Sequence, residues 1–274
     1  MRVKKIVGFF ALLGFVTAFL SSCDPYAKIA KKASVEQKYQ MAMSAFEKGE
    51  YYRALPLLEE LITVYRGTAN AEKVQYYYAY CNYNTGDYIL AAYHFKSFVK
   101  SFPTSTKTEE CAYMNAYCYY LTSPVYSLDQ TDTHMAIREL QSFVNQYPKS
   151  KHLDEANDII SKLRIKLETK ASEIAKQYFK ISNYKSAIVA IDNFTKDFPD
   201  SKFIEELKFV QVKANYLLTV NSIDSKRAER LRSTVDSYLK FVDKYPNSQY
   251  LKEAGAVYDL ALKLKDKYKI QLNT

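Results

Sequence analysis

The stretch GDYILAAYHFKSFVKSFPTS, residues 86–105, contains the pattern that decides the fold. Four side chains stand 12, 8, 5 and 1 residues before Pro103, namely Ala91, Phe95, Phe98 and Phe102. Intervals of four, three and four residues place side chains on one face of an α-helix. Proline ends the helix because it pushes the preceding residue out of the α region. The stretch therefore predicts a turn followed by one amphipathic helix with a defined end.

The same ending occurs three more times, as SFVNQYPKS (142–150), NFTKDFPDS (193–201) and KFVDKYPNS (240–248). Each copy has Phe five residues before the proline, an aromatic residue directly before it and Ser two residues after it. That serine can cap the following helix. A fifth copy with Arg66 in the proline position precedes the others. Such regular recurrence predicts a repeat protein.

Glycine and tyrosine mark the turn inside each repeat, as in Gly49-Glu-Tyr51 and Gly86-Asp-Tyr88, and Asn183-Tyr184 takes this place in a later copy. Helix, Gly-x-Tyr turn, helix and proline together resemble the tetratricopeptide (TPR) pattern. The resemblance implies an all-α, TPR-like superhelical solenoid of about five helix-turn-helix repeats, with a C-terminal capping helix over about 249–268. Proline-to-proline distances of 45, 51 and 47 residues predict helices or loops longer than the usual 34-residue repeat allows, including a loop at 122–133.

Composition agrees with a helical protein, because only 6 Gly and 7 Pro occur in 274 residues, of which 48% are hydrophobic. Three cysteines follow residue 23 and form no CxxC pair: Cys81, Cys111 and Cys118. Two helical turns, about 10 Å, separate the last two, which is too far for a disulfide bond. Buried free thiols are the interpretation we adopt.

The first 22 residues are predicted to be a lipoprotein signal peptide. Basic residues open it, an apolar segment of about 15 residues follows, and Leu-Ser-Ser-Cys at 20–23 resembles the bacterial lipobox. Cys23 would become the first residue of the mature chain and carry the diacylglycerol and N-acyl (palmitate) chains, followed by a tether over 23–33. A transmembrane anchor is the alternative, although the apolar segment is short for a bilayer. Asp24 leaves the inner membrane open as an alternative destination. Cleavage removes three positive charges, so the mature chain has a net charge of +6, which suits an anionic surface or partner.

Tyrosines are dense in the N-terminal half, as in QYYYAYCNY at 75–83. In the TPR pattern, positions 5, 9 and 12 of the first helix of each repeat face the concave groove. Residues 34–150, the N-terminal TPR repeats, place eight aromatic residues and one methionine there: Tyr39, Met43, Phe46, Tyr76, Tyr80, Tyr83, Tyr113, Tyr117 and Tyr120. We expect Tyr78, Ala79 and Ala116 to pack inward. Burial of the tyrosines against a neighbouring helix is the alternative to a peptide-binding wall.

Residues 151–274 form the C-terminal repeats and capping helix, and their groove positions are mostly not aromatic. Alignment on Ala175 places Ser172, Lys176 and Phe179 at the groove positions of one helix. Alignment on Ala214 places Gln211, Asn215 and Leu218 at the same positions of the next.

The motifs that carry catalysis or hold cofactors do not occur in this chain. There is no HExxH, GxSxG, GxGxxG or GxxxxGK[ST] motif, and the three histidines lie far apart. We therefore expect no enzymatic activity, no metal, no cofactor beyond the acyl chains on Cys23, and no nucleic-acid partner for an exported lipoprotein.

A lipobox followed by long TPR repeats resembles the BamD family, the outer-membrane lipoprotein subunit of the β-barrel assembly machinery (BAM complex). The more specific parts of this resemblance are residues 86–105, the loop at 122–133 and YPKSKHLDEA at 147–156. It implies a lipid-anchored protein on the periplasmic face of the outer membrane. Its partners would be the POTRA domains of a BamA-like barrel protein and unfolded outer-membrane protein precursors. A TPR cell-envelope scaffold similar to the CpoB family and a glycan-binding lipoprotein of the SusD type are the alternatives.

Overall fold

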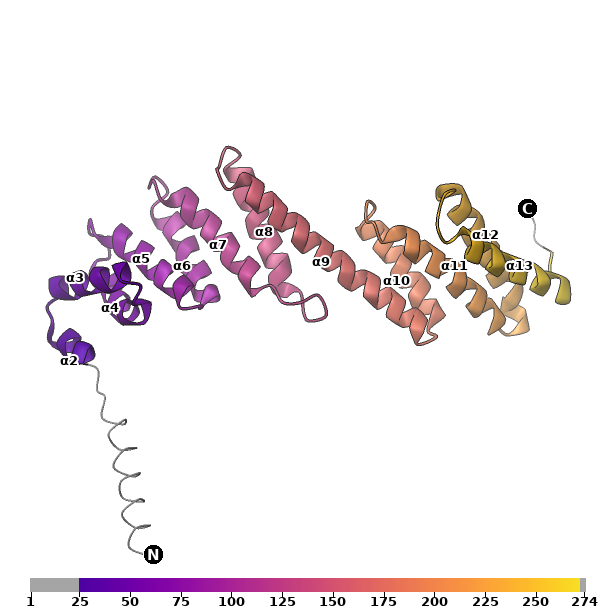
Figure 1. Cartoon of the computed structure of the whole chain (residues 1–274), viewed down its shortest axis with the longest axis horizontal. Helices are drawn as coiled ribbons and strands as arrows, with labels where there is room; N and C mark the ends of the chain where they lie inside the picture. The colour runs from indigo at the N-terminus through magenta and orange to yellow at the C-terminus, as the bar shows by residue number, and fades with distance from the viewer. Residues whose placement is uncertain (1–24, 272–274) are drawn as a thin grey trace, which may run out of the picture. The chain divides into compact units, whose positions relative to one another are not determined.

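The structure, a computed structural model, describes residues 25–271, and these residues form helices joined by turns and short loops, with no strand among them (Figure 1). The predicted signal peptide and Cys23 lie outside the described residues. The helices are α2 (Pro25–Lys32), α3 (Val35–Glu47), α4 (Tyr51–Val64), α5 (Ala71–Asn84), α6 (Tyr88–Ser101), α7 (Thr108–Thr122), α8 (Thr131–Gln146), α9 (Leu153–Lys180), α10 (Tyr184–Asp197), α11 (Ile204–Val220), α12 (Asp224–Lys244) and α13 (Leu251–Lys267).

The chain forms two compact units. Unit 1 consists of the residues up to Thr122 together with Arg138–Leu153, and unit 2 consists of Ser123–Ile137 together with Asp154–Thr274. Within unit 1, α3 to α7 each pack on the next helix of the chain, and within unit 2, α10 to α13 do the same (Figure 1). Packing between consecutive helices is the arrangement of a TPR-like solenoid, so the predicted all-α fold class is confirmed.

A residue with positive φ stands in the turn between the two helices of a repeat. Gly49 and Gly86 have φ of 74° and 86°, which glycine adopts without steric strain. Ser182 occupies the same place before α10 with φ of 63°, a conformation that is strained for a residue with a Cβ atom. A side chain then caps α6 and α10: Asp87 accepts from the N–H of Leu90, and Asn183 accepts from the N–H of Ser186. Glu50, at the start of α4, makes no such side-chain hydrogen bond.

The predicted helix face of each repeat is buried. The phenylalanines five residues before each proline are at most 2% exposed: Phe98, Phe143, Phe194 and Phe241. Each packs against the aromatic residue that precedes the proline, with ring centroids 5.1–5.4 Å apart. Phe102, the residue before Pro103, has left the helical region with φ of −130°. Core packing and helix termination therefore come from the same short motif.

Both longer helices and a loop account for the long repeats, as expected. Helix α9 has 28 residues and α12 has 21. A loop over 123–130 separates α7 from α8. Within unit 2, the buried side chain of Gln130 donates to the carbonyl oxygens of Val125 and Leu128, and Lys166 Nζ donates to Ser123 Oγ at 2.7 Å.

The repeated serine has a role other than the predicted helix cap. Ser105, Ser201 and Ser248 each accept a hydrogen bond from the backbone N–H two residues later. Their hydroxyls donate to glutamates of the preceding repeat at 2.6–2.7 Å: Glu72, Glu168 and Glu205 respectively. The N-caps of α11 and α13 are Phe203 and Tyr250. The serine therefore fixes the turn against the previous repeat and does not cap the next helix.

Candidate functional site

Helices α3, α5 and α7 of unit 1, with the first residue of α4, line a hollow of about 710 Å³, which we call the tyrosine groove. Its aromatic lining consists of Phe46, Tyr51, Tyr76, Tyr77, Tyr80 and Tyr83. Charged side chains line the remainder: Glu72, Lys73, Lys107 and Glu110. The surface therefore offers large ring faces with both signs of charge beside them.

The nine predicted groove residues fall into three groups. Four are half-buried and line the groove: Phe46, Tyr76, Tyr80 and Tyr83. Tyr117 and Tyr120 are half-buried but do not line this hollow. Tyr39, Met43 and Tyr113 are buried, with exposed fractions of 8%, 9% and 4%. The binding role of all nine stays a prediction.

Tyr113, which the TPR pattern places at a groove position, is buried in the structure. Its ring is stacked on His152 at 4.1 Å between centroids and lies 5.4 Å from the ring of Phe143. The alternative of burial against a neighbouring helix therefore holds for this tyrosine. Tyr78, Ala79 and Ala116 are buried, as predicted.

The rings of the tyrosine groove support one another. Tyr76 lies 4.8 Å from Tyr80 and 5.5 Å from Tyr77, and Tyr77 lies 4.6 Å from Phe46. Tyr80 also meets the buried ring of Phe95 edge to face at 5.0 Å. Edge-to-face contacts of this kind are favourable for aromatic rings. The wall is therefore held in place before any ligand binds.

Glu110, on α7, joins the two central tyrosines. Its Oε1 atom accepts hydrogen bonds from the hydroxyl of Tyr76 at 2.8 Å and from that of Tyr80. Lys107 Nζ lies 3.6 Å from Oε2. Burial acts to raise the pKa of Glu110, but the two tyrosine hydrogen bonds and Lys107 outweigh it, so the pKa is lowered. Burial, followed by the hydrogen bond to the carboxylate, raises the pKa of both Tyr76 and Tyr80. Glu110 is therefore a carboxylate and the tyrosines are neutral donors at neutral pH.

Two ammonium groups stand at the groove. Lys107 Nζ lies 5.2 Å from the centre of the Tyr76 ring, and Lys73 Nζ lies 5.8 Å from that of Tyr39. Both lysines are exposed. A cation over an aromatic face is favourable and leaves the remaining N–H donors free for water or a ligand.

The sequence pattern missed several lining residues, including Tyr51, Tyr77, Lys73 and Lys107. Glu110 stands three residues before Tyr113, so its place on the same helix face was readable from the sequence. Lys73 and Tyr77 stand four residues apart on α5, beside the row that contains positions 5, 9 and 12. The pattern therefore does not assign them to the groove.

The predicted groove register of α11 is wrong by two residues. Phe209 stacks on Tyr250 at 4.8 Å, as Tyr113 stacks on His152, and both partners stand four residues after a proline. Gln211 and Asn215 are buried instead, with 9% and 8% exposed. Ser172, predicted for the groove on α9, is also buried.

Residues 25–271 contain no cluster of three or more His, Cys, Asp or Glu side chains able to hold a metal ion. None of the helices in this part of the chain is long and apolar enough to cross a membrane. The three cysteines in it are buried and free, as predicted, and burial raises the pKa of Cys81 and Cys118 to about 12.

Comparison with known proteins gives one family. The model of YfiO, described as outer membrane lipoprotein, matches residues 31–231 and again residues 168–266. A second match that overlaps the first is expected of a chain built from repeats. No curated protein matches the chain significantly. The chain therefore belongs to the YfiO family of outer membrane lipoproteins, which is the BamD family.

Proposed function

We propose that this chain is the non-catalytic lipoprotein subunit of the outer-membrane β-barrel assembly machinery. The family match over most of the described residues is the observation that carries this proposal. Cys23 would hold the chain by its acyl chains to the periplasmic face of the outer membrane. POTRA domains of a BamA-like protein and unfolded barrel precursors would be its partners.

The tyrosine groove is the surface we propose for the precursors. An unfolded barrel strand presents alternating apolar side chains, and a C-terminal segment adds an aromatic side chain and a free carboxylate. Half-buried rings accept apolar and aromatic side chains at little entropic cost, because Tyr has few rotatable bonds. The exposed ammonium group of Lys73 suits the carboxylate, whereas that of Lys107 is paired with Glu110.

Glu110 gives the groove its selectivity in this proposal. Its carboxylate is fully ionised near neutral pH, because its pKa is lowered. A second anion placed near Glu110 would be repelled, so the peptide carboxylate has to lie toward Lys73, away from Glu110. This fixes the direction in which the peptide runs.

Fluorescence anisotropy with a labelled peptide from the C-terminus of a barrel precursor tests the groove. Tyr76→Ala combined with Tyr80→Ala should weaken binding tenfold or more, since aromatic anchors lose about 2 kcal/mol each when truncated. Amidation of the peptide C-terminus should weaken its binding to the unaltered protein. Lys73→Ala should weaken binding of the unmodified peptide to a similar degree.

Tyr52→Ala combined with Tyr93→Ala is the matched control. Those tyrosines are 77% and 65% exposed and do not line the groove, so their removal should leave peptide binding unchanged. A circular-dichroism melt checks that the groove variant still folds. Equal affinity of a folded Tyr76/Tyr80 variant and the unaltered protein would contradict the proposed role of the groove.

A further inference from the structure

Helix α2, with the sequence PYAKIAKK, is the first element that the structure describes. One of its faces packs on unit 1. Ala30 is buried, and the hydroxyl of Tyr26 donates to the backbone carbonyl oxygen of Met41 on α3 at 3.3 Å. The guanidinium carbon of Arg53, on α4, lies 5.4 Å from the centre of the Tyr26 ring. These contacts hold α2 on the first repeat, so the direction of its outer face is fixed as well.

The outer face of α2 is basic. Lys28, Lys31 and Lys32 are exposed, and α2 contains no acidic residue. Intervals of three and four residues place these lysines on one side of the helix, opposite Ala30. None of them forms an ion pair with another residue of the range 25–271. Ile29 is 61% exposed at the edge of the same face. The outer face therefore combines three cations that lack a carboxylate partner with one apolar side chain.

A hollow of about 620 Å³ opens beside this face, between α2 and α3. Ile29 and Lys32 line it from α2, and Met41 lines it from α3. Glu36 lines it too, but its carboxylate oxygens accept hydrogen bonds from Gln40 Nε2 at 3.0 Å and from the Tyr65 hydroxyl at 3.3 Å. Apolar surface is therefore available next to the lysines.

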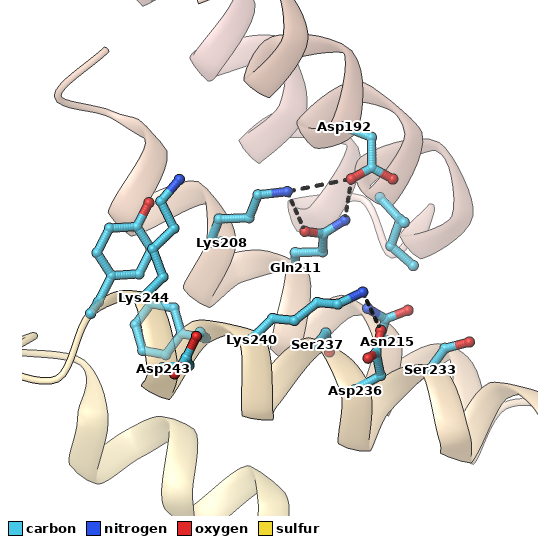
Figure 2. A pocket seen from close by; sticks show the side chains of 13 residues that line it. Asp192, Lys208, Gln211, Asn215, Ser233, Asp236, Ser237, Lys240, Asp243 and Lys244 are labelled. Carbon is cyan, nitrogen blue, oxygen red and sulfur yellow. Dashed lines mark hydrogen bonds and ion pairs between the residues drawn. The ribbon is translucent and has the colours of Figure 1, made fainter. Parts of the chain in front are cut away.

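Two lysines of unit 2 show what a paired ammonium group looks like in this protein (Figure 2). They line a hollow of about 690 Å³ formed by α10, α11 and α12. Lys208 Nζ lies 3.4 Å from Asp192 Oδ1, and Lys240 Nζ lies 2.8 Å from Asp236 Oδ2. Their charges are balanced within the protein, whereas those of α2 attract an external anion.

The sequence brings α2 close to a lipid surface. Cys23, the predicted acylation site, stands two residues before Pro25, and two residues span at most about 7 Å. That is less than the Debye length of about 8 Å at physiological ionic strength. The acyl chains therefore hold the start of α2 within the distance over which headgroup charge acts.

We propose that the outer face of α2 docks on anionic phospholipid headgroups of the membrane that the acyl chains of Cys23 enter. Lys28, Lys31 and Lys32 neutralise the phosphates, as basic residues next to a membrane anchor do. Ile29 enters the boundary between headgroups and acyl chains. An acidic protein segment would suit the same charges, but the anchor brings lipid to this face.

The consequence of this contact is orientation. Three acyl chains hold a protein firmly without further help, so the lysines are not needed for attachment. Because α2 is packed on α3 and α4, its docking sets how unit 1 stands on the membrane surface. This inference rests on the acylation of Cys23 in the proposed function and deepens it.

The acylated chain, purified in detergent and added to vesicles, tests this inference. The vesicles consist of phosphatidylcholine alone or with about 30% phosphatidylglycerol. Ile29→Cys carries a fluorescent label, and the three other unacylated thiols are buried, so only residue 29 is labelled. Acrylamide is the quencher, because it is uncharged and lipid charge does not alter its concentration at the surface.

Quenching of the label at residue 29 should be about threefold weaker on the vesicles that contain phosphatidylglycerol. The difference should disappear in about 1 M NaCl, where the Debye length is about 3 Å. A label introduced by Ile89→Cys, at an exposed position of α6, should be quenched equally on both kinds of vesicle.

Replacement of all three lysines of α2 by Gln should abolish the protection of the label. The matched control removes the same number of charges from exposed positions elsewhere in unit 1 and should preserve it: Lys100→Gln, Lys149→Gln and Lys151→Gln. Equal quenching of the acylated chain on both kinds of vesicle, or protection that survives without the α2 lysines, would overturn this inference alone. An intact mass without acyl chains would overturn the proposed anchor together with it.

Discussion

Tyr80→Phe removes one hydroxyl from the tyrosine groove and leaves the ring against Phe95. Glu110→Gln removes the charge that this hydroxyl faces and preserves the size of the side chain. The two single variants and the double variant form a thermodynamic cycle that isolates the contact between residues 80 and 110. Tyr76, the other donor to the same oxygen, remains in all four proteins.

The expected coupling follows from the geometry. A hydrogen bond to a charged group contributes about 1.5–3 kcal/mol to stability when it is buried. Because the Glu110 side chain is 34% exposed, water screens this bond, and we expect a coupling energy of about 1–1.5 kcal/mol. Each single substitution should then lower the free energy of unfolding of unit 1 by about 1–2 kcal/mol.

The coupling should also depend on pH. The pKa of Glu110 in the folded protein is lowered from its ordinary 4.5, so the unfolded carboxyl takes up a proton at higher pH than the folded one. The stabilisation is therefore complete above about pH 4.5 and is lost as the pH falls through the lowered pKa. The unaltered protein and Glu110→Gln should become closer in stability toward pH 3.

Urea unfolding followed by circular dichroism at pH 7 gives the four free energies. Glu59→Gln, which neutralises an exposed carboxylate on α4, serves as the control and should change the stability by less than about 0.5 kcal/mol. A coupling energy within 0.3 kcal/mol of zero would refute the account of Glu110 as the group that orders the tyrosine wall.

Other parts of the chain give further predictions. Truncation to Ala of any one of the buried repeat phenylalanines should lower the free energy of unfolding by about 3–5 kcal/mol, measured by urea unfolding; these are Phe98, Phe143, Phe194 and Phe241. Unchanged stability for two of them would mean that the buried helix face is assigned wrongly. Ser182→Gly should raise stability by about 0.5–1 kcal/mol, because it relieves the strain of a φ of 63°; a loss of stability would refute this. No thiol of residues 81, 111 and 118 should react with Ellman's reagent at pH 8 before unfolding, since burial keeps these groups protonated, and a fast-reacting thiol would contradict their burial. Cys23→Ala should abolish palmitate labelling and leave uncleaved precursor, so persistent labelling would rule out the lipobox.

The repeat motif allowed the fold to be predicted from the sequence because its physical consequences are local. A proline fixes where a helix ends, and side chains at intervals of four and three residues define its buried face. Phe98 and Phe241 could therefore be assigned to the core without knowledge of their neighbours. The all-α class and the loop between α7 and α8 follow from the same reasoning.

The site was harder to predict because contacts between repeats depend on details that a shared pattern does not contain. Tyr113 and Tyr76 occupy equivalent positions, yet His152 covers the first, whereas the second faces Lys107 and stays half-buried. The residue four positions after each proline decides this difference. In α11, alignment on Ala214 gave a register that the stacking of Phe209 on Tyr250 corrects.

Glu110 illustrates a second limit. It is a polar residue within a helix, and a pattern of apolar positions assigns it no role. Only the packed structure shows that its carboxylate accepts hydrogen bonds from two tyrosine hydroxyls. Hydrogen bonding across helices is a property of tertiary structure, so it was not readable from one helix at a time.

Affinity purification of the tagged chain from detergent-solubilised membranes, followed by mass spectrometry, tests the central claim most directly. The proposed function predicts that a barrel protein with N-terminal POTRA domains copurifies in a near one-to-one ratio, and that it is not enriched with an unrelated tagged lipoprotein of the same membrane. Absence of any such barrel protein from a purification that retains the intact, folded and acylated chain would contradict a role in β-barrel assembly.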